Sequence, residues 1–249
     1  MERRAIAVWG TVQGVGFRPH VHRLASQLKL HGSVRNTGGG VSIEVEGETA
    51  QLEEFLKHLR RDPPPLAQIE ECTWELRPSR GDTGFLIENS SVEGTGDIAI
   101  APDVAVCDAC LAEMWDPENR RYRYPFLNCT NCGPRLTIVT GIPYDRARTT
   151  MADFIMCAAC RAEYDDPEDR RFHAQPVACP NCGPRLVAAD AQGNSVAVED
   201  PLRWFVELLR EGNIGAMKGL GGYHLVCDAR RAETVAALRR RKPMRQPRT

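Results

Sequence analysis

The chain has 249 residues, a length that favours one or two domains, and its hydrophobic (42%) and charged (26%) fractions are those of ordinary globular proteins. A formal net charge of −1 argues against binding nucleic acid through bulk electrostatics. The sequence contains no apolar run of about eighteen residues and no signal-peptide core, so we expect a cytoplasmic protein without a membrane span.

The first part of the chain, residues 1–92, predicts a split βαββαβ domain. Apolar periodicity, a proline at a helix start and glycine- or proline-rich breaks mark its elements. In chain order these are a strand over 4–12, a helix beginning at Pro19, strands over 33–36 and 41–45, a helix over 49–60, a strand over 71–76 and a short edge strand over 85–88. This order is that of a ferredoxin-like α+β fold.

A glycine-containing loop joins the first strand to the first helix. Glycines at positions 14 and 16 let the backbone turn and point N–H groups inward, and the helix N-terminus adds positive potential. Arg18 adds a guanidinium that can bind phosphate oxygens in a bidentate manner. On these features alone, a tight strand-to-helix turn explains the loop better than phosphate binding does. The candidate phosphate-binding residues are Gly14, Val15, Gly16, Phe17 and Arg18.

Two strings in this part resemble the acylphosphatase family. The run from Val12 to Arg18 resembles the family signature, and the run from Gly32 to Asn36 resembles its second motif. The resemblance implies hydrolysis of an acyl phosphate, with the loop amides and Arg18 holding the phosphoryl group. Asn36 would orient the attacking water, which fits a reaction that depends on positioning and charge stabilisation.

Residues 100–190 contain an internal duplication built on cysteine pairs. In each copy a Cys-x-x-Cys pair is followed after eighteen residues by a second pair, and the two copies, 107–136 and 157–186, lie fifty residues apart. Two such pairs complete a tetrahedral all-sulfur site without room for a catalytic water. We expect two structural zinc ions, with iron as the alternative metal, on Cys107, Cys110, Cys129, Cys132, Cys157, Cys160, Cys179 and Cys182.

The spacing leaves the pairing of these cysteines open, because exchange of pairs between the copies satisfies it as well as one ion per copy. Three further residues receive ordinary structural interpretations. His173 is expected on the surface or in packing, and Cys72 and Cys227 are expected to be small core residues.

The last part, residues 199–249, predicts a helix, two strands and a second helix. About fifty residues bury too little surface to stand alone, so we expect an incomplete domain and the front part of a longer protein. The chain ends in a basic, proline-broken run that begins at Arg239 and includes Arg245 and Arg248.

The order of the three parts resembles the HypF family of hydrogenase-maturation carbamoyltransferases. The run from Lys218 to Arg230 is similar to the opening of that family's YrdC-like domain, whereas residues 243–247 depart from its Arg-Pro-x-Lys-Pro run. The resemblance implies that carbamoyl phosphate is hydrolysed in the first domain and that carbamate and ATP, with magnesium, form carbamoyl adenylate. Lys218 and Lys242 are its candidate nucleotide-binding residues.

The same resemblance implies two kinds of partner. A further C-terminal domain of the family would pass the carbamoyl group to a HypE-type acceptor protein. YrdC-like domains are also associated with double-stranded RNA, with which the basic end of the chain is compatible. The competing hypothesis is a zinc-dependent protein- or RNA-binding module that carries a vestigial acylphosphatase domain.

Overall fold

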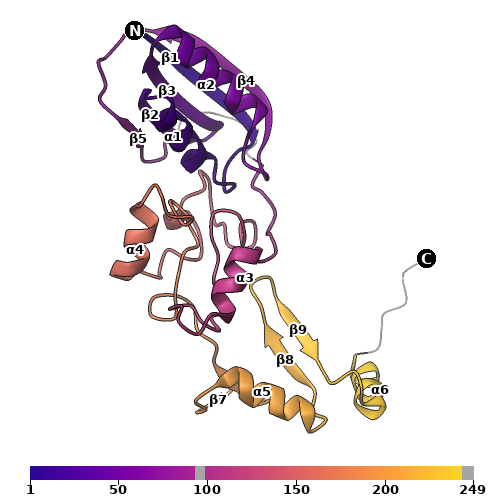
Figure 1. Cartoon of the computed structure of the whole chain (residues 1–249). Helices are drawn as coiled ribbons and strands as arrows, with labels where there is room; N and C mark the ends of the chain where they lie inside the picture. Colours follow the sequence, from indigo (N-terminus) through magenta and orange to yellow (C-terminus); the bar gives the residue numbers. More distant parts are fainter. Residues whose placement is uncertain (93–98, 243–249) are drawn as a thin grey trace, which may run out of the picture. The chain divides into compact units, whose positions relative to one another are not determined.

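The computed structural model describes residues 1–92 and 99–242 (Figure 1). Its contacts divide the chain into two compact units, Met1–Pro184 and Arg185–Thr249, and each is described by itself. The departure at 243–247 and the basic residues Arg245 and Arg248 lie outside the described residues.

The first unit begins with a five-stranded sheet and two helices. In chain order its elements are β1 (Glu2–Thr11), α1 (Phe17–Gln27), β2 (His31–Thr37), β3 (Gly40–Gly47), α2 (Thr49–Arg61), β4 (Gln68–Arg77) and β5 (Phe85–Ile87). The strand order is β4-β1-β3-β2-β5; β5 pairs parallel to β2 and the other neighbours are antiparallel. The ferredoxin-like α+β prediction is therefore confirmed.

Helices α1 and α2 cover one face of this sheet (Figure 1). The apolar stripe of α2 is buried, as its helical spacing predicts. Helix α1 begins at Phe17, two residues before the predicted start at Pro19. Gly16 adopts a left-handed conformation (φ 74°) that ends the preceding loop early, and Pro19 fits the first turn because its missing N–H has no intrahelical partner there.

Strand β4 is confirmed, but it lies at the sheet edge and its apolar side chains are only partly covered. Trp74 pairs with Ile6 of β1 yet remains 41% exposed, and the Arg4 guanidinium stacks over its ring at 4.1 Å. Cys72 is partly buried against the core of the sheet and is not a fully buried residue. An edge strand has a neighbour on one side only, which explains the lower burial.

Glu46 of β3 is a fully buried carboxylate. It accepts hydrogen bonds from the Ser79 hydroxyl, from the backbone N–H groups of Arg80 and Gly81 (2.9 and 3.1 Å), and from the Arg3 guanidinium (3.3 Å). The Ser79 hydroxyl, followed by the Arg80 N–H, lowers the pKa of Glu46 to about 2. These bonds hold the segment after β4 against the sheet.

The lowered pKa of Glu46 predicts a pH-dependent loss of stability. A carboxyl group whose folded pKa lies below its usual 4.5 stabilises the fold above that value, and its contribution is lost as pH falls from 4.5 toward 2. Glu46→Gln should therefore be less stable than the unsubstituted chain at pH 6, and the difference should shrink toward pH 2. Urea unfolding at several pH values measures this, with the exposed Glu70→Gln as control; a pH-independent difference would contradict the assignment.

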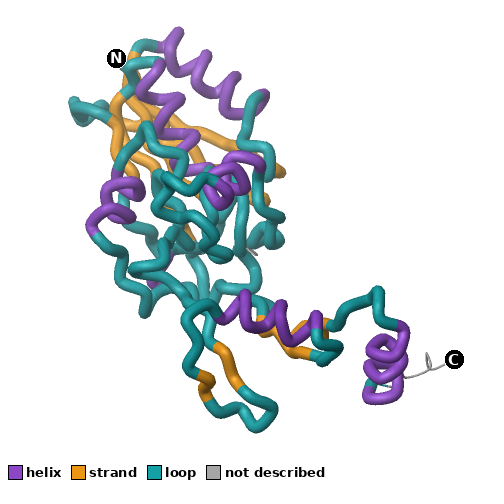
Figure 2. Tube along the Cα trace, turned by 60° about the horizontal axis from the view of Figure 1, so that its bottom comes forward, coloured by secondary structure: helices purple, strands orange, loops and turns teal. Residues whose placement is uncertain are grey.

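Residues 99–184 are mostly loop (teal in Figure 2) around short helices. These are α3 (Asp108–Trp115), the 3₁₀ turn η1 (Arg146–Arg148) and α4 (Ala158–Asp165). The first cysteine of each copy is the N-cap residue of a helix: Cys107 precedes α3 and Cys157 precedes α4. The two eight-residue helices, α3 and α4, are too short to display apolar periodicity, so the sequence pattern does not predict them.

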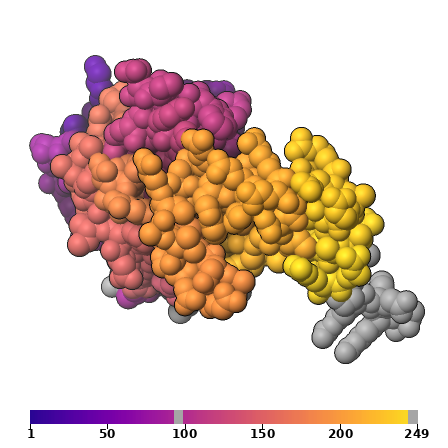
Figure 3. All heavy atoms as spheres, turned by 90° about the horizontal axis from the view of Figure 1, so that it is seen from below, coloured from indigo at the N-terminus to yellow at the C-terminus, as the bar shows by residue number. Residues whose placement is uncertain are grey.

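The second unit consists of β6 (Ala188–Ala189), β7 (Ser195–Val196), α5 (Pro201–Arg210), β8 (Gly215–Lys218), β9 (Tyr223–Val226) and α6 (Ala232–Arg241). The predicted helix-strand-strand-helix order is confirmed. The atoms of the second unit form the orange and yellow part of Figure 3. No residue of α5 is fully buried, and Cys227 is partly buried, not a core residue. Among the described residues, no helix has the length and apolar character needed to cross a bilayer.

Candidate functional site: an anion cradle beside two cysteine clusters

The cradle loop, residues 12–18, connects β1 to α1 as predicted. Gly14 and Gly16 have positive φ values of 75° and 74°, a conformation that other residues rarely adopt. No side chain caps the N-terminus of α1, so its first N–H groups remain available to an anion. The side chain of Arg18 belongs to this first turn and is 9% exposed.

Arg18 and Asn36 converge on one oxygen atom, although they come from α1 and β2. The Arg18 Nη2 and the Asn36 Nδ2 donate to the backbone carbonyl of Tyr144 at 3.3 and 3.0 Å. Arg18 also pairs with the carboxylate of Asp145 at 2.8 Å. The Oδ1 of Asn36 is buried and finds no hydrogen-bond partner among the described residues. Two donors and one free acceptor thus meet at the predicted catalytic position.

Tyr144 and Asp145 belong to the linking loop, residues 137–156, which joins the two cysteine repeats. The backbone N–H of Tyr144 donates to the Gln13 Oε1 at 2.8 Å, and the Gln13 amide donates to the carbonyls of Thr37 and Gly40 at 3.0 and 2.8 Å. Gln13 therefore fixes the linking loop against both the cradle loop and the β2–β3 turn. The sequence pattern does not predict this role of Gln13.

Arg135 makes a second connection between the cysteine repeats and the cradle loop. Its buried guanidinium donates to the Gly14 carbonyl and to carbonyls around the first repeat, including that of Thr130 at 2.8 Å. A Cβ placed on Gly14 would lie 3.3 Å from the Arg135 Cδ and 3.5 Å from a carbon of the Tyr144 ring. The cradle loop is thus packed closely against residues more than a hundred positions away.

A small cavity of about 30 Å³ lies beside the cradle. Its lining combines Arg18 and Asn36 with residues of the cysteine-rich part, among them Tyr144 and His173. Burial, and then the charge of Arg18, lowers the pKa of His173 to about 4, so the imidazole is neutral at pH 7. His173 does pack against aromatic rings, as one prediction allowed, but it also faces the candidate site, which the sequence analysis missed.

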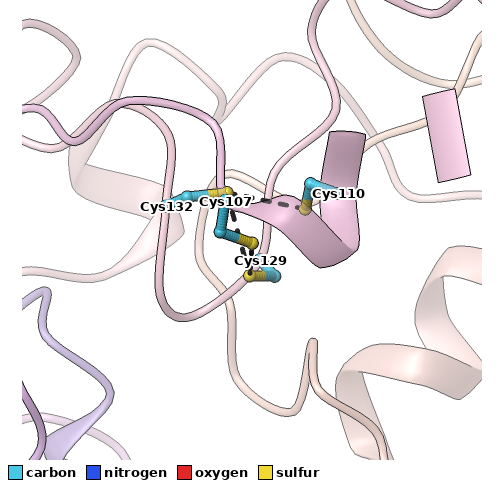
Figure 4. A group of neighbouring side chains, drawn as sticks. All are labelled: Cys107, Cys110, Cys129 and Cys132. Atoms are coloured by element: carbon cyan, nitrogen blue, oxygen red, sulfur yellow. Dashed lines mark hydrogen bonds between the residues drawn. The ribbon is translucent and has the colours of Figure 1, made fainter. Parts of the chain in front are cut away.

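The eight paired cysteines form two separate clusters, one in each repeat. The clusters are Cys107, Cys110, Cys129 and Cys132, and Cys157, Cys160, Cys179 and Cys182; within each, the sulfur atoms lie within 4.8 Å of one another. Figure 4 shows the first cluster converging from α3 and from the loop that carries the second pair. The sequence left the pairing open, and the structure places one four-sulfur cluster in each repeat.

The geometry of both clusters fits a zinc ion. In a tetrahedron with zinc–sulfur bonds of about 2.3 Å, neighbouring sulfurs lie about 3.8 Å apart. The Cys129 sulfur lies 3.8 Å from those of Cys107 and Cys132, and the second cluster has matching distances of 3.6–3.8 Å. With four thiolate ligands, each ion would be structural and would leave no position for a substrate.

Each cluster receives hydrogen bonds from the other repeat. Arg170 of the second repeat donates to the Cys110 sulfur at 3.1 and 3.2 Å, and Arg120 of the first repeat donates to the Cys160 sulfur at 3.4 Å. Two glutamates accept hydrogen bonds from arginines of the opposite repeat in the same way. Arg170 donates to Glu113 at 3.0 Å, and Arg121 donates to Glu163 at 2.5 Å. Because a four-thiolate zinc site carries net negative charge, these guanidinium groups would stabilise the metal in the opposite repeat.

These reciprocal hydrogen bonds predict that a substitution in the second repeat weakens zinc binding in the first. Arg170→Ala should lower zinc affinity at the first cluster about tenfold, in line with the usual effect of losing a group that supports a metal ligand. Alkylation of the cysteines at rising chelator concentration, mapped by peptide mass, resolves the two clusters. Arg161→Ala, which removes an exposed arginine paired with Asp165, is the control. If Arg170→Ala lost zinc at a lower chelator concentration from the second cluster alone, the prediction would be contradicted.

The candidate nucleotide-binding lysines both lie in the second unit. Lys218 ends β8 with its Nζ 5.9 Å from the centre of the Tyr223 ring, and Lys242 is the exposed residue that follows α6. Their role stays a prediction.

Three protein families match successive parts of the chain. The acylphosphatase family matches residues 4–87, the HypF finger family matches 106–139 and 156–188, and the Sua5/YciO/YrdC family, described as telomere recombination, matches 207–247. Acylphosphatase of Moorella thermoacetica is 44% identical over 89 residues, which cover 35% of this chain and 95% of that protein.

Longer relatives match almost the whole chain. Carbamoyltransferase HypF2 of Cupriavidus necator is 56% identical and carbamoyltransferase HypF of Synechocystis sp. is 52% identical, each over 96% of this chain. A crystal structure of full-length HypF in the phosphate- and nucleotide-bound form superimposes with a TM-score of 0.91 at 46% identity, over 97% of this chain and 31% of that one. The chain spans 30–31% of the length of these two curated relatives.

Proposed function

Because the chain belongs to the HypF family, we propose that its acylphosphatase-family domain hydrolyses carbamoyl phosphate to carbamate and phosphate. The oxygen of a water attacks phosphorus, and the bond between phosphorus and the bridging oxygen breaks. Carbamate leaves with that electron pair; one proton of the water passes to solvent and the other stays on the new phosphate hydroxyl. Such a reaction needs charge stabilisation and alignment more than it needs a strong base.

One observation carries the proposal: Arg18 and Asn36 donate to the same oxygen from two different elements. Two donors that reach one atom can also hold one substrate oxygen. The guanidinium and the N–H groups of residues 14–18 in the cradle loop would bind the phosphoryl group. The unpartnered Oδ1 of Asn36 would accept a hydrogen bond from the attacking water.

Each cysteine cluster would hold one zinc ion, which supplies no chemistry to the reaction and ties the linking loop to a rigid support. The role of the cysteine clusters is therefore positional. They hold Tyr144, Asp145 and His173 at the cradle.

The later steps belong to the proposal for the whole family protein, in the cytoplasm. Carbamate would react with ATP and magnesium to form carbamoyl adenylate, with Lys218 and Lys242 contacting nucleotide phosphates. The carbamoyl group would then pass to a HypE-type acceptor protein. A zinc-dependent binding module with a vestigial first domain is not favoured, because the long relatives are carbamoyltransferases and the cradle residues are all present.

Phosphate release by the purified chain tests the proposal. We expect release from carbamoyl phosphate and none from a phosphate monoester such as p-nitrophenyl phosphate, whose leaving group is not an acyl oxygen. A chain that is folded, contains two zinc ions and releases no phosphate from carbamoyl phosphate would refute the proposed function.

A further inference from the structure

We propose that the Asp145 carboxylate and the Tyr144 carbonyl make the cradle selective for a carbamoyl over an acetyl group. The linking loop supplies both acceptors to a site whose two converging donors, Arg18 and Asn36, come from the first domain. The proposal rests on the proposed hydrolysis of acyl phosphates and adds the groups that recognise the acyl end of the substrate.

The contacts place hydrogen-bond acceptors where an anion site needs donors. The Arg18 Nη2 lies 2.8 Å from the Asp145 Oδ1 and 3.3 Å from the Tyr144 carbonyl, which also accepts from the Asn36 Nδ2. A carboxylate and a carbonyl disfavour a phosphate beside them unless the ligand brings donors of its own. The acceptors therefore point to a ligand that combines an anion with N–H groups.

Carbamoyl phosphate has this combination of groups. Its NH₂ carries two N–H donors, whereas the methyl group of acetyl phosphate carries none. A site that is built to bond a substrate N–H rejects an analogue that lacks it, because the acceptors of the site are then buried without partners.

The Tyr144 carbonyl cannot easily turn away to find another partner. Tyr144 is 2% exposed, and its backbone N–H is held by Gln13. The side chain of Asp145 caps neither η1 nor another helix end, and its carboxylate is 28% exposed. Arg18 is the partner that both acceptors share.

Substrate binding would replace Arg18 as the partner of the Asp145 carboxylate. The cavity beside the cradle is small, about 30 Å³, and Arg18 lines it. A bound phosphoryl group would take up the Arg18 guanidinium and so free the Asp145 carboxylate. The carboxylate then loses its cation and accepts an N–H of the carbamoyl group. With acetyl phosphate, the same exchange leaves the carboxylate beside a methyl group.

The test compares kcat/KM for carbamoyl phosphate and acetyl phosphate in the full chain. Asp145→Ala and the nearly isosteric Asp145→Leu should each lower the carbamoyl-to-acetyl ratio about tenfold or more, by slowing the first reaction and accelerating the second. Asp145→Asn retains one acceptor oxygen and should recover part of the ratio. Asp153→Ala, an exposed residue of the same loop, should leave the ratio unchanged.

Zinc content and melting temperature identify the variants that fold, so that if Asp145→Ala fails to fold, Asp145→Leu decides. A folded variant without the carboxylate but with the original ratio would overturn the proposal, even if both rates fell together. Failure of the unsubstituted chain to hydrolyse either compound is a different result, because it would refute the proposed function itself.

Discussion

Arg18→Ala is expected to lower kcat/KM for carbamoyl phosphate about 10³-fold, the upper range for removing one donor that stabilises transition-state charge. The guanidinium is 9% exposed and lies at the convergence point with Asn36, so its charge acts where water screens it little. The loss corresponds to about 4 kcal/mol of transition-state stabilisation. Initial rates of phosphate release measure it.

Two further variants separate catalysis from folding. Arg23→Ala removes an exposed arginine from the same helix and should retain full activity. Arg18→Lys keeps the charge but not the planar fork, so it should recover only part of the rate. Activity of Arg18→Ala within threefold of the unsubstituted chain would exclude Arg18 from the reaction.

Removal of zinc is expected to unfold residues 100–184 while the first domain stays folded. A structural zinc ion contributes about 10–16 kcal/mol to the folding of a small site. Three of the eight buried residues in the second core are cysteines of the first cluster, so its apolar packing is built around the metal ligands. The first domain has a separate core, which lies almost wholly in the sheet and its two helices.

Chelation followed by limited proteolysis measures this difference. The fragment 1–92 should resist cleavage after chelation, and residues 100–184 should become sensitive. Cys132→Ser should reduce the zinc content from two ions to one, whereas Cys72→Ser, outside both clusters, should retain two. Unchanged protease resistance after chelation would show that the metal does not stabilise this part.

The features that sequence predicted well are local ones. The cradle loop, the β2–β3 hairpin and the Cys-x-x-Cys spacing each depend on residues close together in the chain. Their meaning is therefore readable from composition, periodicity and short strings. The start of α1 was wrong by two residues because Pro19 outweighed the left-handed glycine before it.

The residues that sequence analysis missed share a different property. Tyr144 and Asp145 lie more than a hundred positions from the cradle residues they contact, and His173 lies still farther along the chain. One signal was available: the twenty-residue linking loop, 137–156, has no counterpart inside either repeat, and long loops in compact domains are often functional. The length of the loop indicates a function but does not show which residues the loop contacts.

The sequence by itself therefore determined the βαββαβ fold, the cysteine pairs that form the two clusters and the order of the three parts. Only the tertiary structure decided that each cluster belongs to one repeat, that arginines of the opposite repeat support it, and that Asp145 meets Arg18. The physical reason is that backbone propensity and ligand spacing act over a few residues, whereas charge pairing depends on distance in space. Gln13 binds the linking loop and Arg135 ties the first repeat to the cradle loop, and these contacts set that distance at the cradle.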